Sequence, residues 1–172
     1  MAVLEHSGIG VAANNPIRRL ALAGLKLAES LSFLAPLLTR LVIGSSFFMT
    51  GRGKLENFDR TAAFFSEIGV PFARANAAFI GSLEMIGGVC ILLGFGTRIF
   101  SLLLSATMVV ALLTADKDNL IKSFPFSLTD VTPWVYGMFL LWLILCGPGR
   151  LSVDHVIAGK LHLHEEGDNK KV

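Results

Sequence analysis

Four long apolar segments dominate this sequence of 172 residues and restrict it to one class of fold. They lie at about 31–50, 75–95, 99–115 and 131–149, and the last two contain no charged residue. A helix needs ~20 predominantly apolar residues to cross a bilayer, and the core helices of soluble proteins rarely contain such runs. The segments therefore predict an all-α integral membrane protein, a four-helix bundle in which each helix spans the bilayer.

Composition supports this class and argues against others. Apolar residues make up 53% of the chain and charged residues 16%, against about 25% charged residues in an ordinary soluble domain. The net charge of +2 is small and scattered, which argues against a nucleic-acid partner. Cys90 and Cys146 lie in apolar runs without a Cys-x-x-Cys motif, so neither a redox pair nor a metal site is predicted. All four histidines lie outside the apolar segments, which argues against a haem held between helices.

The connections between the segments favour a compact bundle. The link Gly94–Arg98 is short, so the second and third spans should be antiparallel neighbours, with Thr97 as a helix cap. In the first loop, apolar residues share one helical stripe from Phe58 to Ile68, which predicts a helix at the interface or folded over the bundle mouth. The third loop contains Phe124–Leu128, which is too apolar for a solvated linker and is expected to pack on the bundle mouth.

Three regions are expected: a tail and amphipathic helix at 1–30, the transmembrane domain at 31–154, and a polar tail at 155–172. The basic helix carries Arg18, Arg19 and Lys26, which suit anionic lipid headgroups, and the bilayer is the first predicted partner. We expect this segment to be retained, because it lacks the Ala-x-Ala site of a signal peptide. Four spans place both termini on one side, and the distribution of Lys and Arg slightly favours the cytoplasm.

Two charged residues lie where charge is unfavourable. A charge at the centre of a spanning helix costs roughly 2.5–3.5 kcal/mol on insertion scales. Eleven residues separate Arg40 from Gly51 and ten separate Glu84 from Arg74, which places both charges ~15 Å below the same membrane face. Glycines near both residues would allow the two helices to approach closely. The sequence therefore predicts an Arg40–Glu84 ion pair inside the bundle.

The role of this pair has two interpretations that the residues leave open. It is either a buried salt bridge that sets the helix register or a polar pocket for a quinone headgroup or a proton. The sequence Gly51-Arg52-Gly53-Lys54 is similarly either a helix end anchored to lipid phosphates or a lip above that pocket. It is not a nucleotide-binding loop, because neither a preceding strand nor the remaining phosphate-loop residues are present.

Several motifs together resemble the DoxX family. They are Phe48–Leu55, Gly81–Gly88, Leu92–Arg98 and Gly147–Asp154, and the resemblance extends from about residue 34 to 154. It implies a four-helix, multi-pass protein of the bacterial inner membrane with a connection to redox chemistry, since the related DoxD proteins are subunits of a thiosulfate:quinone oxidoreductase. The family's recurrent polar residues correspond to Arg40, Lys54, Glu84 and Arg98. Many relatives also carry a histidine near the end of the third span, and this chain has none there.

These observations lead to one hypothesis and one alternative. The hypothesis is a membrane subunit of a quinone-linked redox complex, with a pocket formed by Arg40, Lys54 and Glu84 and a rim or anchor formed by Arg52 and Arg98. The chain itself would hold no resident cofactor, so electron transfer would need a membrane or redox partner with flavin, iron–sulfur or haem. The alternative is a non-catalytic structural or assembly subunit whose charges serve only helix packing. The sequence leaves open whether the protein is an enzyme.

Overall fold

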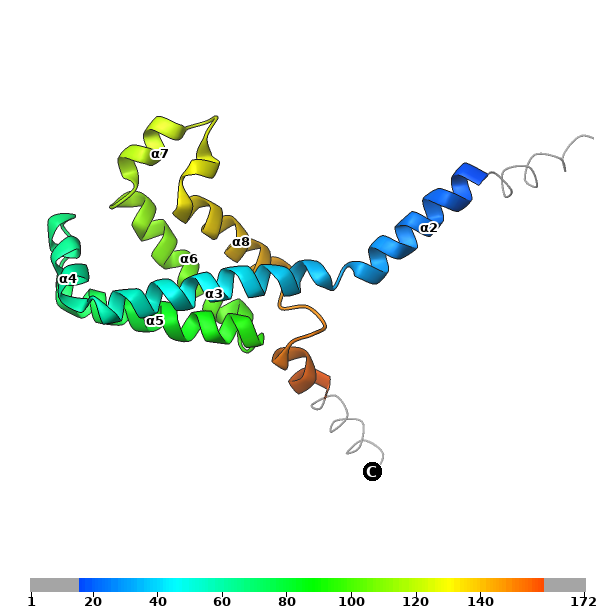
Figure 1. Cartoon of the computed structure of the whole chain (residues 1–172), viewed down its shortest axis with the longest axis horizontal. Helices are drawn as coiled ribbons and strands as arrows, with labels where there is room; N and C mark the ends of the chain where they lie inside the picture. Colours follow the sequence, from blue (N-terminus) through cyan, green and yellow to red (C-terminus); the bar gives the residue numbers. More distant parts are fainter. Residues whose placement is uncertain (1–15, 160–172) are drawn as a thin grey trace, which may run out of the picture. The chain divides into compact units, whose positions relative to one another are not determined.

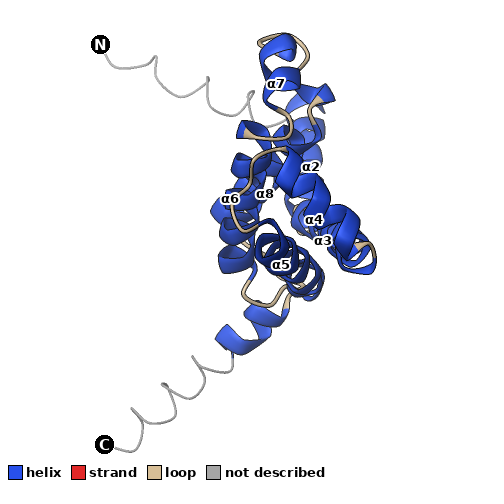
Figure 2. Ribbon diagram, turned by 90° about the vertical axis from the view of Figure 1, so that its left-hand side faces the viewer, coloured by secondary structure: helices blue, strands red, loops and turns tan. Residues whose placement is uncertain are grey.

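The computed structural model describes residues 16–159, and all regular structure in that range is helical. A final helical stretch covers residues 153–159. Figure 2 shows helices and loops, and no strand, over the described residues. The preceding elements are α2 (Pro16–Leu31), α3 (Leu34–Glu56), α4 (Phe58–Glu67), α5 (Ala73–Leu93), α6 (Thr97–Leu113), α7 (Lys117–Ser123), the 3₁₀ turn η1 (Leu128–Asp130) and α8 (Thr132–Cys146) (Figure 1). The predicted all-α class is confirmed.

The helices have the composition expected of a membrane protein. The segments Leu22–Glu56 and Ala73–Leu93 are long and apolar enough to cross a bilayer. A third span results if α6 and α7, which meet at a bend of 81°, are counted together, whereas α8 is apolar but has only 15 residues. The described part of the chain therefore contains two candidate spans, or three with the bent pair, and all four predicted apolar segments are helical.

The chain divides into two units, residues 1–35 and 36–172. In the first unit, the predicted basic helix is part of α2, and its leucines, including Leu20 and Leu25, are exposed. Arg18 and Arg19 lie outside the residues whose side chains are described. The predicted boundaries at residues 30 and 154 stay predictions.

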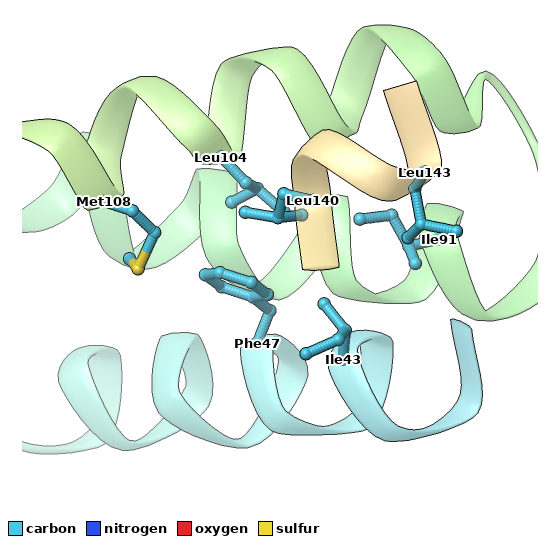
Figure 3. Packing of buried hydrophobic residues seen from close by; sticks show 7 residues of the cluster. All are labelled: Ile43, Phe47, Ile91, Leu104, Met108, Leu140 and Leu143. Atoms are coloured by element: carbon cyan, nitrogen blue, oxygen red, sulfur yellow. The ribbon is translucent and has the colours of Figure 1, made fainter. Parts of the chain in front are cut away.

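The core of the second unit is built by four helices around one apolar cluster. Its buried members come from α3, α5, α6 and α8, and they are Ile43, Phe47, Ile91, Leu104, Met108, Leu140 and Leu143 (Figure 3). Helices α5 and α6 are joined by a tight turn in which Gly94 and Gly96 have φ values of 73° and 55°. Glycine adopts such positive φ values readily, so the predicted turn forms where the glycines stand.

The first loop folds back onto the bundle. Its helix α4 packs on α5 through the buried residues Ala62, Phe65 and Ala77, with Phe58 and Ile68 beside them. These residues include the apolar stripe that predicted an amphipathic helix. The stripe therefore forms a protein contact and covers one end of α5.

The third loop differs from its prediction. Phe124 and Phe126 are 69% and 95% exposed, so the expectation that both pack on the bundle mouth is wrong. The physical reason is the 81° bend between α6 and α7, which interrupts the helix before this segment, so that α6 does not set where Phe124 and Phe126 lie. An apolar stretch in a membrane protein does not require protein contacts, because lipid also accommodates apolar side chains.

Candidate functional site

The register between α3 and α5 decides which charges can meet. A β-carbon at Gly44 would lie 2.9 Å from the carbonyl oxygen of Gly88, and one at Gly51 would lie 2.7 Å from that of Gly81. The two antiparallel backbones are therefore in direct contact at both levels. This register places Arg40 beside the last turn of α5 and Lys54 beside the middle of that helix.

Arg40 is 3% exposed and donates four hydrogen bonds to backbone carbonyls. Its Nε donates to the Ile91 carbonyl at 3.0 Å and its Nη2 to the Leu92 carbonyl at 2.8 Å, in the last turn of α5, where the Ile91 carbonyl also accepts from the backbone N–H of Gly94. Its Nη1 bonds to Pro148 at 2.9 Å and Leu151 at 2.6 Å, in the segment after α8. Four of the five guanidinium N–H groups are thus used inside the fold.

The predicted Arg40–Glu84 ion pair is wrong. Gly51 does not end the first long helix, since α3 continues for another five residues to Glu56. From the ends of α3 and α5 at that face, Arg40 lies 16 residues deep (56 − 40) and Glu84 lies 11 residues deep (84 − 73). At the helical rise these depths are ~24 Å and ~16 Å, so the two side chains lie at different levels.

Asp154 completes the structure around Arg40 and was not predicted as a site residue. Its carboxylate accepts hydrogen bonds from the backbone N–H groups of Gly96 at 2.7 Å and Thr97 at 3.1 Å, which cap the N-terminus of α6. The Thr97 hydroxyl has no partner, so Thr97 is not the cap that the sequence suggested. The motif Gly147–Asp154 could have indicated a return of the chain to the bundle, because the eight residues from the end of α8 to Asp154 are long enough for it.

The partner of Glu84 is Lys54. The ammonium group of Lys54 donates to both carboxylate oxygens of Glu84 at 2.5 Å. The side chain of Glu84 is 2% exposed and that of Lys54 is 30% exposed. The pair therefore joins a fully buried carboxylate on α5 to a partly accessible cation near the end of α3.

A cavity of about 520 Å³ lies against this ion pair. Phenylalanine, isoleucine and leucine side chains of α4, α5 and the loop between them line it on one side, and α6 with the two residues after it lines it from Leu103 to Ala115. Lys54 and Glu84 are the charged residues among its lining. The arrangement is an apolar cavity with one buried ion pair, which suits a ligand that is largely apolar and carries a polar head.

The remaining predicted site residues lie outside this cavity. Arg40 does not line it, and neither does Arg52, whose exposed side chain pairs with Glu56 at 2.7 Å. Arg98 is also exposed, and its guanidinium lies over the backbone of Gly147. Of the five predicted residues, the structure thus brings Lys54 and Glu84 together and separates Arg40, Arg52 and Arg98 from them.

The fold and this site define a helical membrane protein with a buried ion pair beside an apolar cavity. The DoxX family model matches residues 35–117, a range that contains Arg40, Lys54 and Glu84. The predicted resemblance to the DoxX family is therefore confirmed.

One curated relative extends the comparison. The chain is 37% identical over 78 residues to a protein of Bacillus subtilis (strain 168) named "Putative oxidoreductase CatD". The match covers 45% of this chain and 57% of that protein, so the chain spans little more than half of the relative's length. No solved structure matches.

Proposed function

We propose that this protein is the quinone-binding membrane subunit of a redox complex, and that the quinone ring binds in the cavity beside Lys54 and Glu84. The observation that carries the proposal is a fully buried carboxylate, paired with a partly exposed cation, at the wall of an otherwise apolar cavity. Ionisable groups within membrane helices commonly mark ligand or proton pathways. This site replaces the pocket expected around Arg40.

The cavity has the size and chemistry that such a ligand needs. Small-molecule sites usually enclose about 300–1,000 Å³ and combine apolar walls with a few polar groups. The cavity encloses about 520 Å³, and its other polar side chains already have internal partners: Asn76 donates to Pro71, Thr107 to Leu104 and Thr114 to Val110. The ion pair is therefore the main polar feature available to a ligand.

Lys54 and Glu84 can orient a quinone and move protons. An ammonium group has three N–H donors, and two of them reach the carboxylate oxygens of Glu84, which leaves one for a ligand oxygen. Glu84 holds the lysine side chain in position. Because Lys54 is partly exposed, its ammonium group could exchange protons with groups outside the bundle. A bound quinone would supply chemistry that takes up two electrons and two protons.

The redox part of the proposal rests on the comparison and needs a partner. The name of the Bacillus subtilis relative is that of an oxidoreductase, and that protein shares 37% identity with this chain over 78 residues. We propose that a membrane or soluble partner with flavin, iron–sulfur or haem exchanges electrons with the bound quinone. The reaction then requires both proteins, and this chain contributes the quinone site.

A structural or assembly subunit is the second candidate. The observation in its favour is that the hydrogen bonds of Arg40 are all made within the fold, as expected of a charge that stabilises packing. In that case the Lys54–Glu84 pair would also serve only the register of α3 and α5.

Quinone binding by the purified protein in mild detergent separates the two candidates. With a short-tailed benzoquinone as probe, Lys54→Met and Glu84→Gln should each weaken binding about tenfold, a loss of ~1.4 kcal/mol. Arg52→Met is the matched control, because it removes a nearby exposed cation that does not line the cavity. Equal affinity in the wild type and both site variants would support the structural candidate.

A further inference from the structure

The cavity also indicates which part of a ligand lies against α6. Helices α5 and α6 are antiparallel, and a β-carbon at Gly87 would lie 3.1 Å from the Leu104 side chain. Moving three residues back along α5 and three forward along α6 places Glu84 at the level of Thr107. The ion pair therefore lies four residues from the Leu103 end of the α6 wall and seven from Thr114, so the longer part of the wall continues toward Ala115.

Between Leu103 and Met108 at one end and Thr114 at the other, that wall is a groove lined mainly by small side chains. Residues at spacings of three and four share one face of α6, and those on the wall are Leu103, Ala106, Thr107, Val110 and Ala111, followed by Thr114 at the helix cap. From the first to the last, the groove is ~17 Å long at the helical rise. A quinone ring is much shorter than that, so the ring alone would leave most of the groove empty.

The groove opens on the outside of the bundle. Leu103 and Val110 on α6 and Phe79 on α5 line the cavity and are themselves exposed. All three are apolar, and α5 is long and apolar enough to cross a bilayer. A surface of this kind in a membrane protein faces acyl chains, so the opening leads to the lipid phase.

From the ion pair, the groove and its opening we infer that the cavity takes a ligand with a long hydrocarbon tail, which enters sideways from the bilayer. The inference rests on the proposed quinone site. The polar ring lies at Lys54 and Glu84, and the tail extends along α6 over Ala111. The side chain at position 111 therefore determines how much tail the site accepts.

The test compares two probes with the same benzoquinone ring, one carrying a methyl group and the other a decyl tail. Binding is measured by equilibrium dialysis against the full chain in lipid nanodiscs, and protein-free nanodiscs correct for partitioning. We expect the decyl probe to bind the wild type at least tenfold more tightly. Ala111→Phe should remove this preference by filling the groove, and Val109→Phe, an exposed α6 position outside the cavity, should keep it.

The outcomes are distinguishable. Equal corrected affinities of the wild type for both probes, or an unchanged preference in Ala111→Phe, would overturn the tail groove and leave the quinone site standing. Failure of both probes to bind the wild type would overturn the quinone site together with the groove. Ala111→Leu, which adds less volume, is tested in parallel, and both variants are required to elute as folded, monodisperse protein.

Discussion

Arg40 and Glu84 are both buried charges on neighbouring helices, and their surroundings differ in kind. Arg40 is surrounded by four backbone carbonyls from the end of α5 and from the segment after α8. Glu84 has one ionic partner, Lys54, and lies against a cavity of about 520 Å³. Both side chains are almost completely inaccessible, so burial alone does not distinguish them.

The difference shows how one membrane bundle uses charge in two ways. A guanidinium whose donors bond to backbone carbonyls connects segments that are far apart in the sequence, which stabilises the fold. A carboxylate with one partly exposed partner retains the capacity to interact with a ligand. We therefore assign Arg40 to the packing of the chain and propose the Lys54–Glu84 pair as the ligand site. Three variants test this comparison.

The largest effect is expected for Arg40→Ala. It would leave the carbonyls of Leu92, Pro148 and Leu151 without this donor, and each unpaired buried group costs about 1–3 kcal/mol, whereas the Ile91 carbonyl keeps the backbone N–H of Gly94. The free energy of unfolding should fall by more than about 3 kcal/mol, measured by thermal unfolding in detergent with circular dichroism. Arg52→Ala is the control, because its exposed pair should change stability by about 0.5 kcal/mol or less. If Arg40→Ala and the wild type unfold at the same temperature, Arg40 does not stabilise the fold and its assignment to packing is wrong.

An intermediate effect is expected for Gly51→Ala. The new β-carbon would overlap the backbone of Gly81 and Glu84, so α3 and α5 would have to separate beneath the ion pair. Overpacking of this kind costs about 1–3 kcal/mol, measured in the same unfolding assay. Gly53→Ala is the matched control on the same helix, because no atom lies within 4 Å of its β-carbon position and stability should not fall. Equal stability of the two variants would show that the helices are not in contact at Gly51.

The smallest loss of stability is expected for Glu84→Gln. Lys54 loses its charged partner, but its side chain is 30% exposed and can turn toward polar surroundings, while the glutamine oxygen can still accept one hydrogen bond. The free energy of unfolding should change by about 1 kcal/mol or less, because neutralising the buried carboxylate also removes the cost of burying its charge. If Glu84→Gln lowers the free energy of unfolding as much as Arg40→Ala does, the Lys54–Glu84 pair is structural in the same sense as Arg40.

Much of the fold could be predicted because its causes are local. The four apolar segments become helices, the stripe of α4 packs against α5, and the turn forms at Gly94 and Gly96. These features follow from periodicity and from backbone freedom, which are properties of short stretches of sequence. Phe124 and Phe126 could not be placed in this way, because their exposure depends on the direction in which α7 leaves α6.

The sequence singled out the charged residues, but it assigned their ionic partners wrongly. Arg40, Lys54 and Glu84 all stand out in the sequence because they are charges in or beside apolar segments. Their pairing depends on the contacts of Gly44 and Gly51 with α5, and an error of a few residues in the end of α3 changes which charges share a level. The motif Gly147–Asp154 indicates that the chain can return to the bundle, but not where Asp154 binds, because its target, the start of α6, is 57 residues away along the chain.

The sequence alone determines that this protein is helical, that its helices are apolar enough for a membrane, and which few charges those helices contain. Composition and periodicity suffice for these conclusions, because the bilayer selects helices by length and polarity. Tertiary structure decides that Arg40 bonds to backbone carbonyls, that Glu84 pairs with Lys54, and that a cavity lies beside this pair. Those outcomes depend on contacts between segments that are distant in the sequence and on the register of α3 against α5. Close contact of the two backbones at Gly44 and Gly51 fixes that register.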